Sequence, residues 1–370
     1  MSNMEHAGGA IASERTTITP SDPKGPAAPE AGHVMRAEIH EQPSRWAAFL
    51  DEAAGSLTEG RRLLDSGPRF VLFVARGTSD NAALYGSYLV QTALGLPTGS
   101  ASPSATTLYG ARPDMDAVLV VAISQSGQSP DLLAFVEMAR SRGARVLAVT
   151  NVGDSPLAEA AHACVDVMAG PERAVAATKT YTGQLLALLA LFGAPHGRGG
   201  LAALPEAAAR VLSGASAPVR DLAARYRYAT RAVVTGRGYS SASARESALK
   251  LAETAYLSAH GYSAADLLHG PMAMLDEQVP LLLFTSAGPD AAQMRDLAGL
   301  ARERQVEVDV IGDGTVTAGS LPALLPAGLA PVVRPLLEIL PAQLLAAELA
   351  VSRGHDPDAP RGLQKVTHTL

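Results

Sequence analysis

Three charged side chains lie at helical spacing in one stretch of the sequence. Glu246, Lys250 and Glu253 stand at positions i, i+4 and i+7, so a helix would place them above one another on a single face. A solvated ladder of ion pairs is the commoner outcome of this pattern. Near a reactive carbon, however, a carboxylate beside a lysine could act as a general base with electrostatic support, and His269, followed by Gly and Pro, could supply a further proton-transfer group.

A run of hydroxyl and amide side chains follows a strongly apolar segment. Residues 117–122 are all Ala, Val or Leu, and soon after them come Ser124, Gln125, Ser126, Gly127, Gln128 and Ser129. A strand that ends here and enters a helix near Asp131 sets amides and hydroxyls at a helix N-terminus, which favours an anion. An ordinary Ser-rich helix cap is the alternative. Because the Gly-Lys-Ser/Thr sequence of a nucleotide P-loop is missing, a sugar phosphate suits the loop better than ATP.

The elements that must position these residues follow a regular order along the chain. We expect strands at 70–75, 117–123, 146–150, 232–236, 279–285 and 306–311, separated by longer Ala- and Leu-rich helical stretches. This alternation predicts an α/β fold with parallel sheets built by βαβ crossovers. Ligands bind at the C-terminal edge of such sheets, and Thr78 and Ser79, after the first strand, are expected to add hydroxyls to the same pocket.

The sequence also contains an internal repeat. A shift of about 161 positions places residues 74–79 on residues 235–240, and both copies read as a strand that runs into Arg-Gly-x-Ser and then a helix. The same shift places the Ser-rich loop on residues 285–290, where the glycine persists while hydroxyls are lost and a carboxylate, Asp290, appears. We therefore expect two copies of one α/β unit, with phosphate binding only in the first.

Composition excludes several classes of protein. The chain has 370 residues, 47% of them hydrophobic, and a net charge of −6, so it holds enough apolar material for a core and offers no basic field for nucleic acid. No apolar run is long enough to span a membrane and no signal peptide is apparent, which leads us to expect a cytoplasmic protein. The single cysteine, Cys164, is expected to be a buried and inert thiol.

From about Met35 onward the chain resembles the sugar isomerase (SIS) domain family, and most closely the isomerase half of glucosamine-6-phosphate synthases and their stand-alone deaminase relatives. The resemblance rests on residues 35–43, similar to the family's opening helix; on 76–79 and 124–129, similar to its phosphate loops; on 175–179; on 246–253, similar to its catalytic helix; on 269–271; and on 356–365, similar to its C-terminal loop. It implies two tandem SIS subdomains, each a flavodoxin-like parallel sheet flanked by helices.

The resemblance also assigns roles to residues. It makes Glu253 the base, Lys250 its partner, His269 the ring-opening group and Lys365 the C-terminal catalytic lysine. The residues expected to bind the substrate and its phosphate are Gly77, Thr78, Ser79, Ser124, Gln125, Ser126, Ser129, Val175 and Ala177. Ala177 replaces a serine of the family pattern and Gln128 a glutamate. We expect no metal and no cofactor, because no step needs one and the His, Asp and Glu residues show no ligand spacing.

The expected activity is conversion of glucosamine 6-phosphate to fructose 6-phosphate and ammonia. No glutaminase-type segment precedes residue 35 in this sequence, which favours free-ammonia chemistry in the catabolic direction. One alternative is a 2,3-dehydratase of N-acetylglucosamine 6-phosphate, because an acetylated amine cannot form an imine. A phosphosugar deglycase and a non-catalytic sugar-phosphate sensor are further alternatives, although a sensor would not need Glu253, His269 and Lys365 together.

The resemblance further implies a homodimer in which His269 serves the pocket of the other subunit. The stretch before it, residues 261–268, is mostly small and apolar and could pack across a two-fold interface. Along the chain we expect a disordered tail at 1–33, a first subdomain with the phosphate loop at 34–215, a second with the catalytic helix at 216–345, and the active-site loop at 346–370.

Overall fold

The computed structural model describes residues 30–193 and 198–365. Most of the predicted tail, residues 1–29, lies outside this range. Ala31 and Gly32 form a turn and His33 begins helix α1 (His33–Glu52), so the last residues assigned to the tail belong to the folded chain. The reason is a long-range contact, because the Gly32 amide donates a hydrogen bond of 3.0 Å to the side chain of Asp356.

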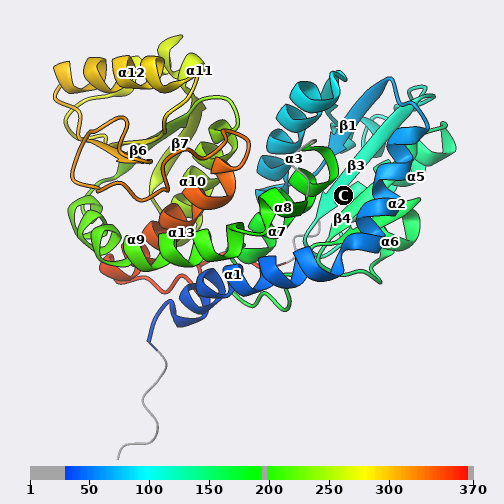
Figure 1. Ribbon diagram of the computed structural model, residues 1–370, viewed down its shortest axis with the longest axis horizontal. Helices are drawn as coiled ribbons and strands as arrows, with labels where there is room; N and C mark the ends of the chain where they lie inside the picture. The colour runs from blue at the N-terminus through cyan, green and yellow to red at the C-terminus, as the bar shows by residue number, and fades with distance from the viewer. Residues whose placement is uncertain (1–29, 194–197, 366–370) are drawn as a thin grey trace, which may run out of the picture. The chain divides into compact units, whose positions relative to one another are not determined.

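The first sheet is parallel and has the strand order β2-β1-β3-β4-β5. Its three central strands, β1, β3 and β4, are labelled in Figure 1. In chain order its strands are β1 (Phe70–Val74), β2 (Thr98–Ser100), β3 (Val118–Ser124), β4 (Arg145–Thr150) and β5 (Ala163–Asp166). Its helices are α2 (Ala54–Asp65), α3 (Thr78–Leu89), α4 (Pro103–Thr107), α5 (Pro130–Ser141), α6 (Pro156–Ala160) and α7 (Lys179–Phe192), and a π-helical turn, Val90–Leu94, extends α3. Strand β3 is almost wholly buried, as expected of a central parallel strand.

The second sheet is also parallel and has the order β7-β6-β8-β9. Its strands are β6 (Arg231–Gly236), β7 (Ser258–Ser263), β8 (Leu281–Phe284) and β9 (Val308–Ile311), and its helices are α10 (Ser240–Ala255), α11 (Ala264–Leu268) and α12 (Ala291–Glu303), with a 3₁₀ turn at Pro271–Met274. This order repeats the first four positions of the first sheet, 2-1-3-4, which is the flavodoxin-like order. The predicted α/β fold with two similar units is confirmed.

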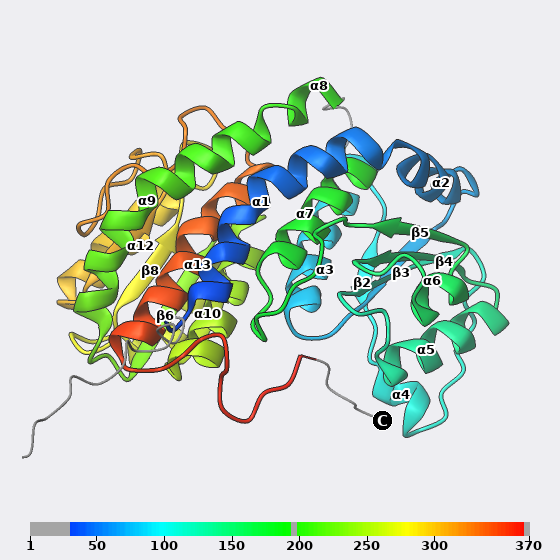
Figure 2. The same ribbon diagram turned by 90° about the horizontal axis from the view of Figure 1, so that it is seen from below.

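Long helices fill the space between the two sheets. Helix α9 (Leu204–Tyr226), preceded by the short α8 (Arg198–Leu201), packs on α13 (Arg334–Ser352), and α13 packs on α10 and α1 (Figure 2). One hydrophobic cluster runs through these helices and both sheets. Within the described part of the chain α13 is the one helix long and apolar enough to cross a membrane, but 83% of its apolar window is buried in the protein. Its apolar faces are therefore covered by its neighbours.

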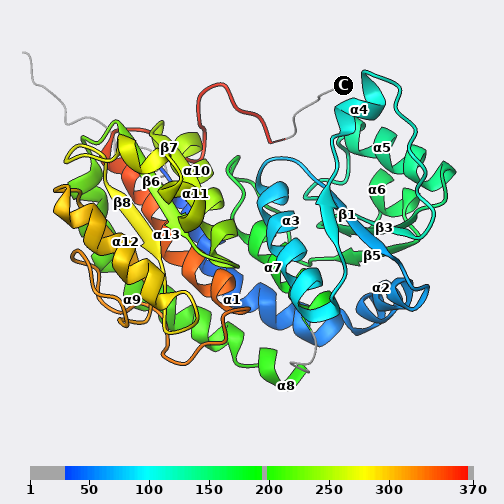
Figure 3. The same cartoon turned by 90° about the horizontal axis from the view of Figure 1, so that it is seen from above.

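Helices α3 and α10, which occupy the same place in the two repeats, pack against each other (Figure 3). They run in opposite directions. The hydroxyl of Thr78, at the start of α3, donates a 3.1 Å hydrogen bond to Glu246 in the middle of α10, while Thr92, just after α3, lies 2.6 Å from the hydroxyl of Tyr239 at the start of α10. Each end of this helix pair therefore combines the beginning of one helix with the far end of the other.

Candidate active site

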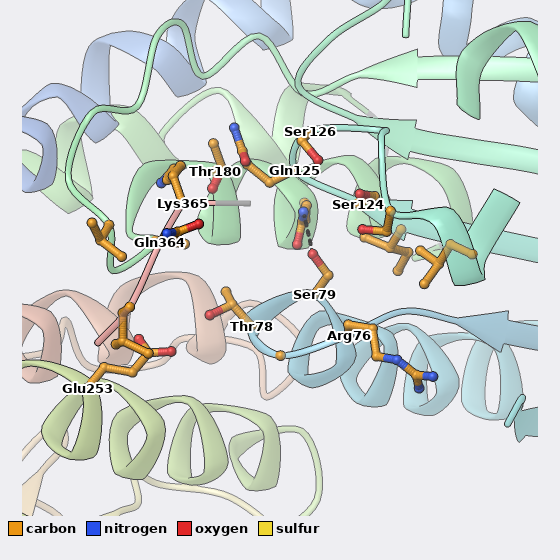
Figure 4. A pocket seen from close by; sticks show the side chains of 18 of the residues that line it. Arg76, Thr78, Ser79, Ser124, Gln125, Ser126, Thr180, Glu253, Gln364 and Lys365 are labelled. Atoms are coloured by element: carbon orange, nitrogen blue, oxygen red, sulfur yellow. Dashed lines mark hydrogen bonds between the residues drawn. The ribbon is translucent and has the colours of Figure 1, made fainter. Parts of the chain in front are cut away.

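A pocket of about 370 Å³ opens where the first sheet's C-terminal edge meets α10. Every site residue predicted from the sequence lines it, except His269. Figure 4 shows Ser124, Ser126 and Ser79 around one part of the pocket and Glu253 and Lys365 around another. The structure thus brings together segments that lie far apart in the sequence: the loops after β1 and β3, the segment before α7, helix α10 and the C-terminal loop.

The loop between β3 and α5 has the geometry of an anion site rather than of a capped helix. Ser129 occupies the N-cap of α5 but its side chain makes no capping hydrogen bond, so its hydroxyl is available to a ligand. Gly127 has a φ of +63°, and a Cβ there would collide with the side chain of Ser155. A hydrogen bond within the loop fixes its conformation: the Gly127 amide donates to the side-chain hydroxyl oxygen of Ser124 at 3.1 Å. These features favour the phosphate interpretation over the Ser-rich cap.

The loop between β1 and α3 supplies the second wall of the pocket. Ser79 is buried, and its hydroxyl accepts a 3.0 Å hydrogen bond from the amide of Gln184 on α7, drawn as a dashed line in Figure 4. Arg76 forms an ion pair of 2.7 Å with Asp131 on α5. This pair ties the two loops together and also neutralises Arg76, which leaves hydroxyls and backbone amides as the groups that face a ligand.

The charged face of α10 is buried rather than solvated, so the interpretation as a surface ion-pair ladder is wrong. The Lys250 ammonium contacts Glu253 and lies 3.5 Å from the carboxylate of Glu246. Glu246 is fully buried and accepts hydrogen bonds from Thr78 at 3.1 Å and from Asn81 at 2.8 Å. The Glu253 side chain is 24% exposed and lines the pocket. Of the two carboxylates, Glu253 alone faces a ligand.

Electrostatics distinguish the two glutamates further. Burial raises the pKa of Glu246 to about 7, and this shift outweighs the opposing effects of Lys250 and Asn81. Burial by itself would lower the pKa of Lys250, but Glu246 and Glu253 outweigh it and raise this pKa above its usual value. Lys250 therefore stays cationic beside Glu253, while Glu246 can hold a proton near neutral pH.

Lys365 lines the pocket and is held by an ion pair with Glu172 that the sequence did not predict. Its ammonium lies 2.6 Å from the Glu172 carboxylate and 2.8 Å from the carbonyl of Ala174. Glu172 also accepts bonds from the amides of Thr178 and Thr180. Burial alone would raise the pKa of Glu172, yet Lys365 and these amides outweigh it and hold the pKa below its usual value. Glu172 follows Gly-Pro in an irregular segment, and no motif marks it.

The C-terminal loop that carries Lys365 is fixed at two points. Asp358 accepts hydrogen bonds from the backbone amides of Val34 and Met35, at 2.9 and 2.7 Å, and so caps the start of α1. Further along, the Arg361 amide donates to the hydroxyl of Tyr256 at 2.7 Å, and its guanidinium lies 4.1 Å from the centre of that ring. Sequence reasoning named Lys365 but missed these anchors.

His269 does not line the pocket. It follows α11 on the surface of the second repeat, where its side chain is exposed and its Nδ1 lies 2.7 Å from the carbonyl oxygen of Ala265. The preceding residue, Leu268, is 39% exposed. The described chain therefore brings the predicted base, the two lysines and the predicted phosphate loop together in one pocket, with the predicted ring-opening group outside it.

Two other expectations concern cysteine and metal. Cys164 is half-buried rather than buried, and burial, assisted by Asp166, raises the pKa of its thiol to about 11, which disfavours the reactive thiolate. Among residues 30–193 and 198–365, no group of three or more His, Cys, Asp and Glu side chains gathers as metal ligands would. The pocket's chemistry, as far as the structure describes it, is carried by carboxylates, ammonium groups, hydroxyls and amides.

Comparison with known proteins gives the same picture. The SIS domain pattern matches residues 67–194 and 226–317, one segment in each repeat. A glutamine–fructose-6-phosphate aminotransferase (isomerizing) of Methanothermobacter thermautotrophicus is 38% identical over 90% of this chain; the chain spans 57% of that relative's length. A crystal structure from Silicibacter pomeroyi DSS-3, of a protein provisionally assigned as a phosphosugar isomerase, is 34% identical, with a TM-score of 0.77 over 87% of this chain and 99% of that one.

A third similarity concerns the fold alone. Glucosamine-6-phosphate deaminase of Thermotoga maritima is 22% identical and superposes with a TM-score of 0.73, covering 90% of this chain and 99% of the other. The family pattern covers both repeats, and the similarity to the M. thermautotrophicus relative runs through nearly the whole chain. The twofold α/β architecture is thus that of a known group, and the chain belongs to the SIS domain family.

Proposed function

We propose that the protein is an aminosugar-phosphate isomerase and deaminase that converts glucosamine 6-phosphate to fructose 6-phosphate and ammonia. One observation carries the proposal: the Glu253–Lys250 pair shares a pocket with the Ser-rich anion loop at the end of β3. A carboxylate held beside an ammonium, in a pocket that also binds phosphate, suits proton transfer between adjacent carbons of a sugar phosphate. Lys365 adds a second cation at the same pocket.

The steps follow from the positions of these groups. Phosphate held by the loop around Ser126 orients the open-chain aldehyde. Glu253 takes the proton from C2 and returns it to C1, while O1 gains a proton and the amine nitrogen loses one. The C2 amine thereby becomes a C2 imine through an enolamine, and the C1 aldehyde becomes an alcohol. Lys250 and Lys365 stabilise the negative charge that develops on the oxygens during this transfer. Addition of water to the imine then releases ammonia and leaves fructose 6-phosphate.

The choice of an amino sugar draws support from the relatives. The archaeal relative is named for fructose 6-phosphate, and the T. maritima protein for glucosamine 6-phosphate. These two compounds are the product and the substrate of the reaction described above. This chain spans 57% of the archaeal relative, so the similarity supports the proposal for the matched part only.

Ring opening is the step for which the described pocket has no group, and we assign it to His269 of a second subunit in a homodimer. Its Nδ1 is held by the carbonyl of Ala265, which leaves Nε2 free to exchange a proton with a substrate. Exposed Leu268 beside it offers apolar surface for a two-fold contact. Under this proposal each pocket becomes complete only in the dimer.

The decisive experiment offers the purified protein two substrates. Glucosamine 6-phosphate should yield ammonia and fructose 6-phosphate in equal amounts, while its N-acetyl form should be inert. An unsaturated, ultraviolet-absorbing product from the N-acetyl form would identify a 2,3-dehydratase instead. No product from either compound, together with tight binding of both, would identify a sensor and refute the proposal.

A further inference from the structure

A second pocket lies at the C-terminal edge of the second sheet. It has a volume of about 490 Å³ and is formed where α10 and α12 begin, next to the first residue of α13 and the end of α3. Its lining is Tyr88, Thr92, Arg237, Gly238, Tyr239, Ser240, Pro289, Asp290, Gln293, Pro331 and Arg334. None of these residues belongs to the candidate active site.

This second pocket is the counterpart of the active site under the internal repeat. The shift of about 161 positions places Arg76, Gly77, Thr78 and Ser79 of the first pocket on Arg237, Gly238, Tyr239 and Ser240 of the second. It likewise relates Ser129 to Asp290, and Leu132 to Gln293. Because α3 and α10 run in opposite directions, the same operation relates Glu253 at the far end of α10 to Thr92 just beyond α3. The two pockets are therefore built from equivalent loops and helices of the two repeats.

The second pocket lacks the groups that would make it catalytic. Thr92 stands where the first pocket has Glu253, and Leu89 where it has Lys250. Neither side chain can take a proton from carbon or place a positive charge beside a developing oxyanion. A ligand would be bound here without being converted by the chemistry of the first pocket.

What the second pocket has instead is an unpaired cation. In the first repeat Arg76 is neutralised by Asp131, but the residue equivalent to Asp131 is Ala292. Arg237 is accordingly exposed, and no ion pair to it is found among the described residues. Arginine lining a concave site with a free guanidinium fork matches phosphate geometry.

A second arginine is built into the floor of this pocket. Arg334, at the first position of α13, is 2% exposed and forms a 3.1 Å ion pair with Asp290. Its Nε has no hydrogen-bond partner, and the same holds for the second carboxylate oxygen of Asp290. The charges of Arg334 and Asp290 offset each other, so the pocket keeps the net positive charge of Arg237.

Two tyrosines also line this pocket. The rings of Tyr88 and Tyr239 lie with their centres 5.7 Å apart, and the Tyr239 hydroxyl lies 2.6 Å from that of Thr92. Pro289 and Pro331 add apolar surface. Tyrosine faces of this kind stack on the rings of sugars and bases, and a bare inorganic ion would make no use of them. The volume also exceeds the 370 Å³ of the active-site pocket.

We propose that this pocket is a second, non-catalytic binding site for an organic phosphate monoester, with the phosphate on Arg237 and a ring-containing group against Tyr88 and Tyr239. The proposal departs from the sequence-based expectation that only the first repeat binds phosphate, because Arg237 takes the place of the hydroxyls that the second repeat has lost. The proposal does not depend on the reaction assigned to the first pocket, since it concerns binding alone. A sugar phosphate and a nucleoside monophosphate share this chemistry. The two sources are separated by the probes used below.

The test measures binding by calorimetry in the Ser126→Ala/Ser129→Ala variant, whose active-site loop is disabled. Glucose 6-phosphate, adenosine 5′-monophosphate and inorganic phosphate are the probes. We expect saturable binding of at least one organic phosphate, at least ten-fold tighter than that of inorganic phosphate. Amide hydrogen exchange should show protection by that ligand at residues 237–241 and 288–293, and none at 124–129.

Two further variants locate the binding. Arg237→Ala should weaken it at least ten-fold, and Gln293→Glu should weaken it by placing a carboxylate beside the phosphate. Arg295→Ala is the matched control, an exposed arginine on the neighbouring α12 that does not line the pocket, and should change nothing. Absence of saturable binding by either organic probe, equal affinity for inorganic phosphate, or unchanged affinity in Arg237→Ala would each overturn the proposal.

Discussion

The ammonium of Lys365 lies 2.6 Å from the carboxylate of Glu172, and this ion pair joins the C-terminal loop to the segment that precedes α7. Glu172 is buried and is itself held by the amides of Thr178 and Thr180. The position of Lys365 in the pocket is therefore set by a carboxylate that does not line the pocket.

Replacement of Glu172 should consequently affect turnover. In Glu172→Gln the amide oxygen can still accept from the two backbone amides, but the charge that holds Lys365 is lost, and we expect kcat to fall at least ten-fold. Because the pKa of Glu172 is lowered in the folded state, its stabilising effect is present above pH 4.5 and is lost as the pH falls further. In the variant, the free energy of unfolding should therefore fall less steeply as the pH is lowered below 4.5. Glu41→Gln, which breaks the nearby ion pair with Lys179, is the control for turnover and should leave kcat unchanged.

Glu253→Gln should abolish turnover while phosphosugar binding stays within a few-fold of the unmodified protein. The amide keeps the shape of the side chain but cannot take a proton from carbon. Steady-state assays of ammonia release, paired with calorimetric binding of glucosamine 6-phosphate, check both halves of this statement. Substantial turnover in the variant would remove Glu253 as the base.

Phosphate recognition by the first pocket should depend on the hydroxyls of its loop. Ser126→Ala combined with Ser129→Ala should raise KM strongly, since each charge-assisted hydrogen bond lost costs about 1.5–3 kcal/mol. Ser286, in the matching loop of the second repeat, is buried with an unpartnered hydroxyl, so Ser286→Ala is the control and should leave KM unchanged. Equal effects of the two changes would contradict the assignment of the phosphate site to the first repeat.

Glu246 should make stability decrease between pH 4.5 and about 7. Its pKa is raised to about 7 by burial, so the folded protein binds this proton more tightly than the unfolded chain does. The contribution is full below pH 4.5, is lost as the pH rises through 7, and is then constant. Glu246→Gln stays neutral and should remove this part of the slope, which is measured as the difference between the two proteins in urea unfolding across the pH range. An identical pH profile would show that the pKa of Glu246 is the same in the folded and the unfolded protein.

Shared pockets can be tested by mixing inactive subunits. If His269 acts across a dimer interface, exchange between Glu253→Gln and His269→Ala chains should regenerate mixed dimers with one intact pocket, and activity should return. Fluorescence energy transfer between labelled subunits confirms that exchange has occurred. Exchange without recovered activity would show that His269 does not act on the pocket of the other subunit.

The sequence predicted the interior strands of both sheets but missed three of the four edge strands. The six expected strands are all present, because the interior strands of a parallel sheet are apolar on both faces, as in 118–124. The three strands that were not expected are β2, β5 and β7, and each lies at the edge of its sheet. The sequence of β7, Ser-Ala-His-Gly-Tyr-Ser, is only partly buried and has no apolar run. The fourth edge strand, β9, is fully buried and was expected, so it is the partly exposed edge strands that carry too weak a pattern to be recognised alone.

The site shows the same division. Residues such as Ser124 and Glu253 belong to local motifs, so their types and spacing were sufficient to select them. Glu172 and Gln184 act through partners more than 100 positions away, Lys365 and Ser79, and nothing in their local sequence marks them. Spacing also left open whether the charged face of α10 was solvated, and the burial of Glu246 decided that.

The opposed packing of α3 and α10 has a consequence for how such a protein could arise. Each pocket takes its loop from one repeat and its facing helix from the other, so a single unit standing alone would hold only half of either pocket. Two copies of one ancestral unit, paired about a two-fold axis, would have formed both pockets at once and made them identical. After duplication and fusion the two copies of the facing helix would be free to differ, as they do in this chain, with Glu253 and Lys250 facing one pocket and Thr92 and Leu89 at the equivalent positions of the other.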